Sequence, residues 1–300
     1  MFGWNGYKGF GLDIGTSAVK AVQLQKTGDE YRVQAAWQTE IVPAGDPEGY
    51  RRNTIEAIRE CVASAKIKSR YAVCGVSGSE VIVRNFRFPE LPEEEIEPAV
   101  RMEAAQVCPF EMEQGVVVYH QTPFETAGAG ESGGTAVGEK KTTGILAAAP
   151  HKIIRAKQML VKSAGFHCAI LETDSLALLN GLRSYQRIPP GQALVLVNVG
   201  AKYSNVIITA GDGIPFMRDL PHAGSTMIEQ VAQESQMTPE QVRACLREPR
   251  QAAGGNLELA GRLKGACQNL LSDISETIRY YKAHIGFAQT ETVLVSGGFC

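Results

Sequence analysis

Alternating apolar and polar positions predict antiparallel strands at the start of the chain. Residues 9–25 and 30–42 alternate in this way around a glycine-containing turn at 27–29, which is typical of a hairpin or meander. Apolar residues at helical spacing over 48–66 predict an amphipathic helix. The same patterns predict strands over 71–75, 81–88, 116–121, 145–149 and 168–171, and helices from Glu93 onward, over 151–164 and over 173–184.

Two stretches interrupt these patterns and predict loops. Residues 126–144 are rich in Gly, Ser and Thr, which is typical of a flexible loop tip. The Ile-Pro-Pro-Gly motif at 188–191 cannot continue a helix, because proline lacks a backbone N–H, so we place a domain boundary there. A chain of 300 residues suits two domains of ordinary size.

The second half repeats the opening theme. Residues 193–220 read as strand, glycine turn, strand, Gly-Asp-Gly turn and strand. A helix-rich stretch follows over 224–285, with predicted breaks at 238–239 and 252–256. Residues 292–298 then predict an apolar strand of the buried type that ends in two glycines.

Composition excludes several classes of function. The chain is 44% hydrophobic with a formal net charge of −2, which gives no general attraction to nucleic acid or to an anionic membrane. We see no apolar run near the roughly 20 residues that span a bilayer, and the first residues lack the apolar core of a secretory signal. The seven cysteines contain no Cys-x-x-Cys pair, which favours free thiols over a zinc site.

Matching hairpins in the two halves predict a phosphate site. Residues 11–24 and 195–209 each run from an apolar strand through a glycine and small or polar residues into a second strand. Glycine lets an anion approach backbone N–H groups, while Thr16, Ser17 and Lys20 add hydroxyl donors and a positive charge. Asp13 would repel phosphate and suits a hydrated Mg²⁺ instead. One such hairpin alone leaves a purely structural role open, because glycine turns are common.

The order of three glycine motifs carries a family resemblance. Asp-Ile-Gly-Thr-Ser at 13–17, Val-Asn-Val-Gly at 197–200 and Val-Ser-Gly-Gly at 295–298 resemble the phosphate 1, phosphate 2 and adenosine motifs of the actin-like ATPase superfamily. Within it the chain is most similar to the PilM family, FtsA-like cytoplasmic proteins of type IV pilus assembly. The stretches that carry this closer likeness are 100–121, 147–182, 216–234 and 270–284.

The resemblance implies an α/β fold of two RNase H-like lobes flanking a nucleotide cleft, with an FtsA-like inserted subdomain. The implied division is 9–84 plus 166–188 for the first lobe, 85–165 for the insertion, 191–217 plus 269–300 for the second lobe and 218–268 for a helical subdomain. It implies that ATP and Mg²⁺ are the cofactors. The implied nucleotide-binding residues are Gly15, Thr16, Ser17, Lys20, Asn198, Gly200, Ala201, Lys202, Gly224, Gly297 and Gly298, with Asp13 holding Mg²⁺ through water.

Three features depart from the superfamily pattern. Asn198 stands where a magnesium-binding aspartate is usual, so hydrolysis should be weak, and Asn198→Asp should raise it. The usual Gly-Gly before a helix is Ala223-Gly224 here. The sequence stops at Ser-Gly-Gly-Phe-Cys where relatives continue, so either the second lobe is short at its C-terminal side or the sequence is truncated.

The implied function is an ATP-binding scaffold at the cytoplasmic face of the inner membrane, in type IV pilus assembly or related type II secretion. Its implied partner is the cytoplasmic N-terminal peptide of a PilN-type membrane protein, in a groove between the first lobe and the insertion. Pilus assembly ATPases and self-association are further implied contacts, whereas nucleic acid is not. A small-molecule (sugar) kinase and an FtsA-like filament-forming protein are the alternatives.

Overall fold

The computed structural model describes residues 9–28, 30–122, 141–185, 188, 192–210, 214–247, 256–284 and 289–299. The chain divides into two compact units, Met1–Arg187 and Ile188–Cys300, which are described separately below. Residues 126–140 of the predicted loop tip over 126–144, residues 189–191 of the linker and residues 252–255 of the predicted helix break over 252–256 lie outside the described residues. The finer four-part division stays a prediction.

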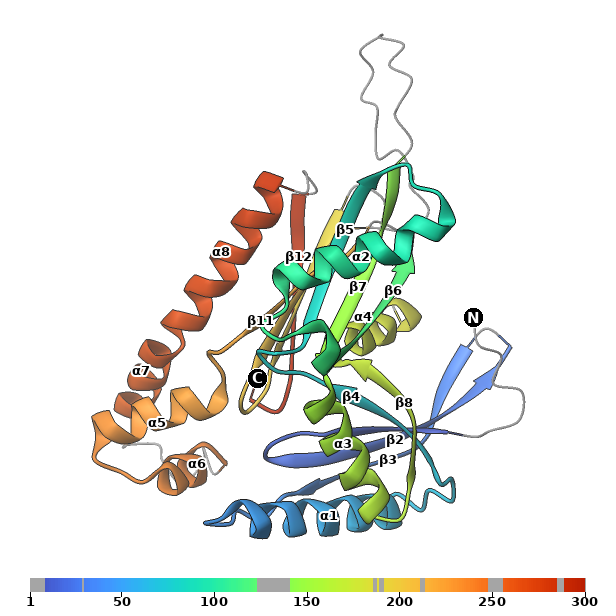
Figure 1. Ribbon diagram of the computed structural model, residues 1–300. Coiled ribbons are helices and arrows are strands. Elements are labelled where there is room, and N and C mark those ends of the chain that lie inside the picture. The colour runs from blue at the N-terminus through green and yellow to red at the C-terminus, as the bar shows by residue number, and fades with distance from the viewer. Residues whose placement is uncertain are drawn as a thin grey trace. The chain divides into compact units, whose positions relative to one another are not determined.

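The first unit is built on a five-stranded sheet in the order β3-β2-β1-β4-β8 (Figure 1). Strands β1 (Phe10–Ile14), β2 (Ala18–Thr27) and β3 (Glu30–Glu40) form the predicted antiparallel meander. Strands β4 (Tyr71–Val76) and β8 (His167–Thr173) extend the sheet in parallel with β1. The helices of this part are α1 (Pro47–Ser64), α3 (His151–Ser163) and α4 (Asp174–Tyr185).

Strict alternation in β1 builds the core of this sheet. Phe10, Leu12 and Ile14 are buried, and the residues between them are exposed. Helix α1 packs its apolar face, including Ile58, against the same cluster. The helix begins where the Asp46 carboxylate accepts a hydrogen bond from the Gly49 N–H at 2.8 Å, which satisfies one of its unpaired amides.

A second, three-stranded antiparallel sheet has the order β5-β7-β6. Its strands are β5 (Ile82–Pro89), β6 (Gly115–Gln121) and β7 (Lys141–Pro150), and they are accompanied by α2 (Glu93–Val107) and the short η1 (Met112–Gln114). Helix α2 crosses one face of the sheet (Figure 1), where Val100 and Ala104 pack with Phe86 and Leu146. Strand β7 begins four residues earlier than predicted, because Gly144 pairs with Phe86 and lies directly against its ring.

The second unit holds a four-stranded sheet in the order β11-β10-β9-β12. Strands β9 (Gln192–Val199), β10 (Ser204–Ala210) and β11 (Phe216–Leu220) are antiparallel neighbours, and β12 (Gln289–Ser296) is parallel to β9. Its helices are α5 (Gly224–Ser235), α6 (Pro239–Arg247), α7 (Asn256–Ala266) and α8 (Gln268–His284). The break between α7 and α8 was not predicted from the sequence.

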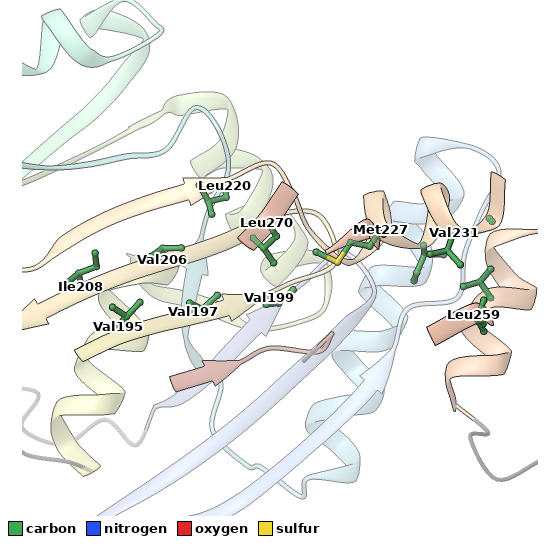
Figure 2. Close-up of a cluster of buried hydrophobic side chains, with 14 of the residues drawn as sticks. Val195, Val197, Val199, Val206, Ile208, Leu220, Met227, Val231, Leu259 and Leu270 are labelled. Atoms are coloured by element: carbon green, nitrogen blue, oxygen red, sulfur yellow. The ribbon is translucent and has the colours of Figure 1, made fainter. Parts of the chain in front are cut away.

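One face of this sheet carries the core of the second unit. Figure 2 shows Val195, Val197, Val206 and Ile208 on β9 and β10 in this core. Met227, Val231, Leu259 and Leu270 join them from the helices. Burying a side chain of this size contributes about 1.5–3 kcal/mol. Because side chains alternate along a strand, the residues between these point to the opposite face.

The predicted strand over 292–298 is confirmed by β12, but the prediction that this strand is buried is wrong. Val293 and Val295 are 52% and 59% exposed. Strand β12 lies at the edge of the sheet and pairs with β9 alone among the described strands, while α8 packs over β10 and β11. An apolar run does not by itself reveal which face of an edge strand another element covers.

Candidate functional site

The glycine turn after β1 is held in a tight conformation. The Gly15 N–H donates to the Ala18 carbonyl at 3.1 Å, and a Cβ on Gly15 would lie 2.9 Å from that oxygen. Position 15 therefore requires glycine. Thr16 and Ser17 form the tip of the turn, where both are exposed.

Carbonyl groups of this turn are tied to the surrounding structure. The Ile14 oxygen accepts from Lys157 Nζ at 3.0 Å, the Thr16 oxygen from the Tyr50 hydroxyl at 3.1 Å, and the Ser17 oxygen from the Ile41 N–H at 2.9 Å. Burial raises the pKa of Tyr50, so its hydroxyl stays protonated and able to donate. Within the described residues, the N–H groups of Thr16 and Ser17 donate no hydrogen bond. The tip of the turn therefore offers N–H donors to a ligand, while three of the carbonyl oxygens at the turn are already bonded, as in an anion-binding nest.

Lys20 and Asp13 stand opposite each other on β2 and β1, beside this turn. Lys20 Nζ lies 3.2 Å from Asp13 Oδ2, and both side chains are about half exposed, with relative exposures of 41% and 52%. An exposed pair of this kind contributes little to stability, about 0–1 kcal/mol. Both charged groups are therefore available to a ligand at little cost.

The turn after β9 repeats the geometry of the first turn. The Gly200 N–H donates to the Tyr203 carbonyl at 3.1 Å, and a Cβ on Gly200 would lie 2.6 Å from that oxygen. Ala201 and Lys202 occupy the tip, and their N–H groups have no acceptor among the described residues. Lys202 Nζ lies 5.5 Å from the centre of the Tyr203 ring. Residues 15–18 and 200–203 are thus the same local structure.

Three glycine segments of the second unit converge at this turn. The N–H groups of Gly224 and Ser225 donate to the carbonyls of Gly200 and Ala201 at 2.9 and 2.8 Å. Gly297 has a φ of 114°, and a Cβ there would lie 2.7 Å from backbone atoms of Val199. The structure therefore brings together predicted residues that are nearly 100 positions apart in sequence.

Gly224 has a packing role that the sequence did not indicate. The resemblance implies that Gly224 binds nucleotide, but its N–H donates to the Gly200 carbonyl. A Cβ on Gly224 would lie 2.6 Å from the Phe299 ring, so glycine is needed for close packing against the end of the chain. By contrast, Gly298 faces open space.

Asn198 begins a row of polar side chains across three strands. It is paired in register with Asn205 on β10, which is paired with Asp219 on β11. Asn198 Nδ2 lies 2.9 Å from Asn205 Oδ1, and Asn205 Nδ2 lies 2.7 Å from Asp219 Oδ1. The row occupies the face opposite the apolar core, and Asn205 is only 3% exposed.

The tip N–H groups of both turns are hydrogen-bond donors and the lysines beside them are cations, which suits an anionic ligand. Among the described residues, no group of three or more His, Cys, Asp or Glu side chains could hold a metal ion. Asp13 therefore offers one carboxylate, which suits Mg²⁺ only where waters and phosphate oxygens supply its other ligands.

Sequence reasoning missed the residues that support these turns. Lys157 and Ile14 are 143 positions apart, and Tyr50 and Thr16 are 34 apart. Both donors approach backbone carbonyls from helices, so no local motif marks them. In the sequence, Asn205 and Asp219 are only polar residues within apolar strands. The alternation pattern alone does not indicate that they contact each other.

The first unit also contains a cavity of about 410 Å³. Glu80 and Lys152 form an ion pair at 2.6 Å in its lining. The Phe110 ring, also in the lining, lies against Gly115, where a Cβ would come within 3.0 Å of the ring and 2.9 Å of the Ala149 carbonyl. The remaining lining residues are Pro109, Glu111, Gln114 and Pro150.

Paired glycine turns, each at the head of an α/β unit, define the class of protein: the chain has the actin-like ATPase fold. A family model for the type IV pilus assembly protein PilM matches residues 11–300, and the chain belongs to this family.

Solved structures agree with this assignment at the level of the fold. A PilM-PilN type IV pilus biogenesis complex is similar with a TM-score of 0.78 and 20% identity, over 97% of this chain and 82% of that chain. The ethanolamine utilization protein EutJ from Carboxydothermus hydrogenoformans is similar with a TM-score of 0.54 and 14% identity, over 97% and 76%. No helix in the described part of the chain is both long and apolar enough to cross a membrane.

Proposed function

We propose that this PilM-family protein is an ATP-binding scaffold of the inner-membrane platform that assembles the type IV pilus. The proposal that the protein binds a nucleotide is supported by one observation: the same glycine-turn geometry occurs in both units. A turn whose tip N–H groups have no acceptor among the described residues has the chemistry of a phosphate cradle. The lysine beside it can leave its exposed ion pair at little cost in free energy.

The predicted nucleotide-binding residues would have different roles. In the first unit, the N–H groups of Thr16 and Ser17, with Lys20, would hold phosphate. In the second unit, the N–H groups of Ala201 and Lys202 would do the same. Gly15 and Gly200 shape the turns, because their own N–H groups are already bonded. Gly297 and Gly298 would lie beside the adenosine. Bound Mg²⁺ would neutralise phosphate charge, with Asp13 contributing through water.

Hydrolysis should be slow. A carboxamide remains neutral and cannot accept a proton as a general base, so Asn198 cannot replace a catalytic aspartate. Nucleotide would then act as a ligand that favours one arrangement of the protein over another, which requires different affinities for the two. A coupled assay with a panel of sugars separates this function from a kinase, since robust turnover would contradict the scaffold.

The partner we propose is the cytoplasmic N-terminal peptide of a PilN-type membrane protein, bound at the 410 Å³ cavity. The similar solved structure is a complex of PilM with PilN. The cavity offers an aromatic wall in Phe110 and a charged rim in Glu80 and Lys152, which suits a peptide with apolar and polar side chains. This contact would hold the protein at the cytoplasmic face of the inner membrane, and the assembly ATPases and self-association stay predictions.

Phe110→Ala should weaken binding of this peptide about tenfold or more, because buried aromatic anchors dominate interfaces of this kind. Fluorescence polarisation with a labelled peptide measures the effect. Trp37→Ala is the matched control, since Trp37 is a half-exposed aromatic on β3, in the other sheet of the same unit. Equal affinities for the wild type and Phe110→Ala would place the peptide elsewhere.

A further inference from the structure

The polar row across β9, β10 and β11 has a direction that chemistry alone determines. The Asp219 carboxylate can only accept hydrogen bonds, so Asn205 must turn its NH₂ group toward it. The other branch of the Asn205 carboxamide is then its carbonyl, which faces Asn198. Asn198 must therefore donate with Nδ2, and its Oδ1 is turned away from Asn205.

The side-chain oxygen of Asn198 has no hydrogen-bond donor in the part of the chain that the structure describes. Within the described residues, Asn198 Oδ1 accepts no hydrogen bond, and the side chain is only partly buried. Asn198 also lies two residues before Gly200, next to the turn that carries the unused N–H groups. An acceptor thus stands beside a group of donors.

We infer that Asn205 and Asp219 are positioning residues that lock the Asn198 carboxamide with its oxygen toward the nucleotide site. This inference rests on the proposed nucleotide function. In that orientation Asn198 can accept a hydrogen bond from water bound to Mg²⁺, a role that an inverted amide could not fill. Asp219 acts through Asn205 and Asn198 and needs no contact with the nucleotide.

The same row predicts that aspartate is disfavoured at position 198 of this chain. A carboxylate at that position would face the Asn205 oxygen, acceptor against acceptor. Inverting Asn205 would only move the conflict to Asp219, because both ends of the row would then be acceptors. Asn198→Asp is therefore compatible with the row only if Asp219→Asn reverses the direction of its hydrogen bonds. The rise in hydrolysis expected for Asn198→Asp thus requires both substitutions.

A double-mutant cycle tests this directly in the whole 300-residue chain. We expect Asn198→Asp to lower the Tm of the wild type by about 5 °C. In the Asp219→Asn background the same substitution should lower Tm much less. The Asp219→Asn variant measures whatever else that carboxylate holds. Additive effects of the two changes would overturn the inference. Should Asn198→Asp fail to fold, recovery of soluble protein in the double variant supports the inference, and continued insolubility contradicts it.

Two further measurements test whether the coupling between positions 198 and 219 passes through Asn205. Repeating the cycle in an Asn205→Leu background should abolish the coupling, whereas through-space repulsion between carboxylates would preserve it. Asn205→Leu should also reduce ATP affinity about tenfold in Mg²⁺ and leave it unchanged in EDTA, while an equal loss in both would mean a merely structural role. If the wild type binds no ATP, the proposed function fails, but the Tm cycle still decides the direction of the row.

Discussion

Gly297→Ala is expected to destabilise the second unit strongly for the addition of a single methyl group. Gly297 has a φ of 114°, a conformation that side chains rarely adopt, and its added Cβ would overlap the Val199 backbone. Backbone cannot move aside as a flexible side chain can. We expect a loss of about 3 kcal/mol in the free energy of unfolding, measured by urea denaturation.

Gly298 supplies the matched control for this prediction. It is adjacent in sequence, its Cβ would meet nothing within 4 Å, and its φ is not positive. Gly298→Ala should therefore stay within about 0.5 kcal/mol of the wild type. Equal free energies of unfolding for the two alanine variants would contradict the close packing of Gly297 against the Val199 backbone.

Removing the charge of Lys20 is expected to have the largest effect on nucleotide affinity. Lys20 lies beside the tip of the first turn, and among the described residues its ammonium group contacts only the exposed carboxylate of Asp13. A charge-assisted hydrogen bond to phosphate is worth about 1.5–3 kcal/mol, so Lys20→Ala should weaken ATP binding about 10- to 100-fold. Calorimetric titration in the presence of Mg²⁺ measures the affinity.

Stability and a second lysine control for indirect effects. Lys20→Ala should change Tm little, because an exposed pair with Asp13 contributes little to folding. Lys26 lies on the same strand and contacts the Tyr31 ring, away from the turn, so Lys26→Ala should leave ATP affinity unchanged. Equal losses in both variants would show a general effect of charge and contradict the cradle.

Much of the fold could be predicted because local patterns determine it. Alternation identified β1 and β2, an apolar run identified β9, and the glycines of their turns were recognisable because only glycine fits at 15 and 200. The family resemblance identified the actin-like fold, which the comparisons confirm. The assignment of individual residues to a nucleotide stays a prediction.

The remaining features depend on contacts between distant segments. That Lys157 supports Ile14, or that the Gly224 N–H is consumed by Gly200, follows from tertiary packing and leaves no trace in the local sequence. The exposure of Val293 depends on which strand α8 covers. The orientation of the Asn198 amide requires all three members of its row, so the identity of residue 198 alone was insufficient.

The central claim, that this PilM-family protein binds ATP without using it rapidly, is tested most directly by one calorimetric titration. The wild-type protein is titrated with ATP in Mg²⁺, and phosphate release is then followed in the same sample. We predict saturable binding and a turnover rate far below about 1 s⁻¹, the lower end for typical enzymes. The absence of any binding heat, or phosphate release at an ordinary enzymatic rate, would contradict the account.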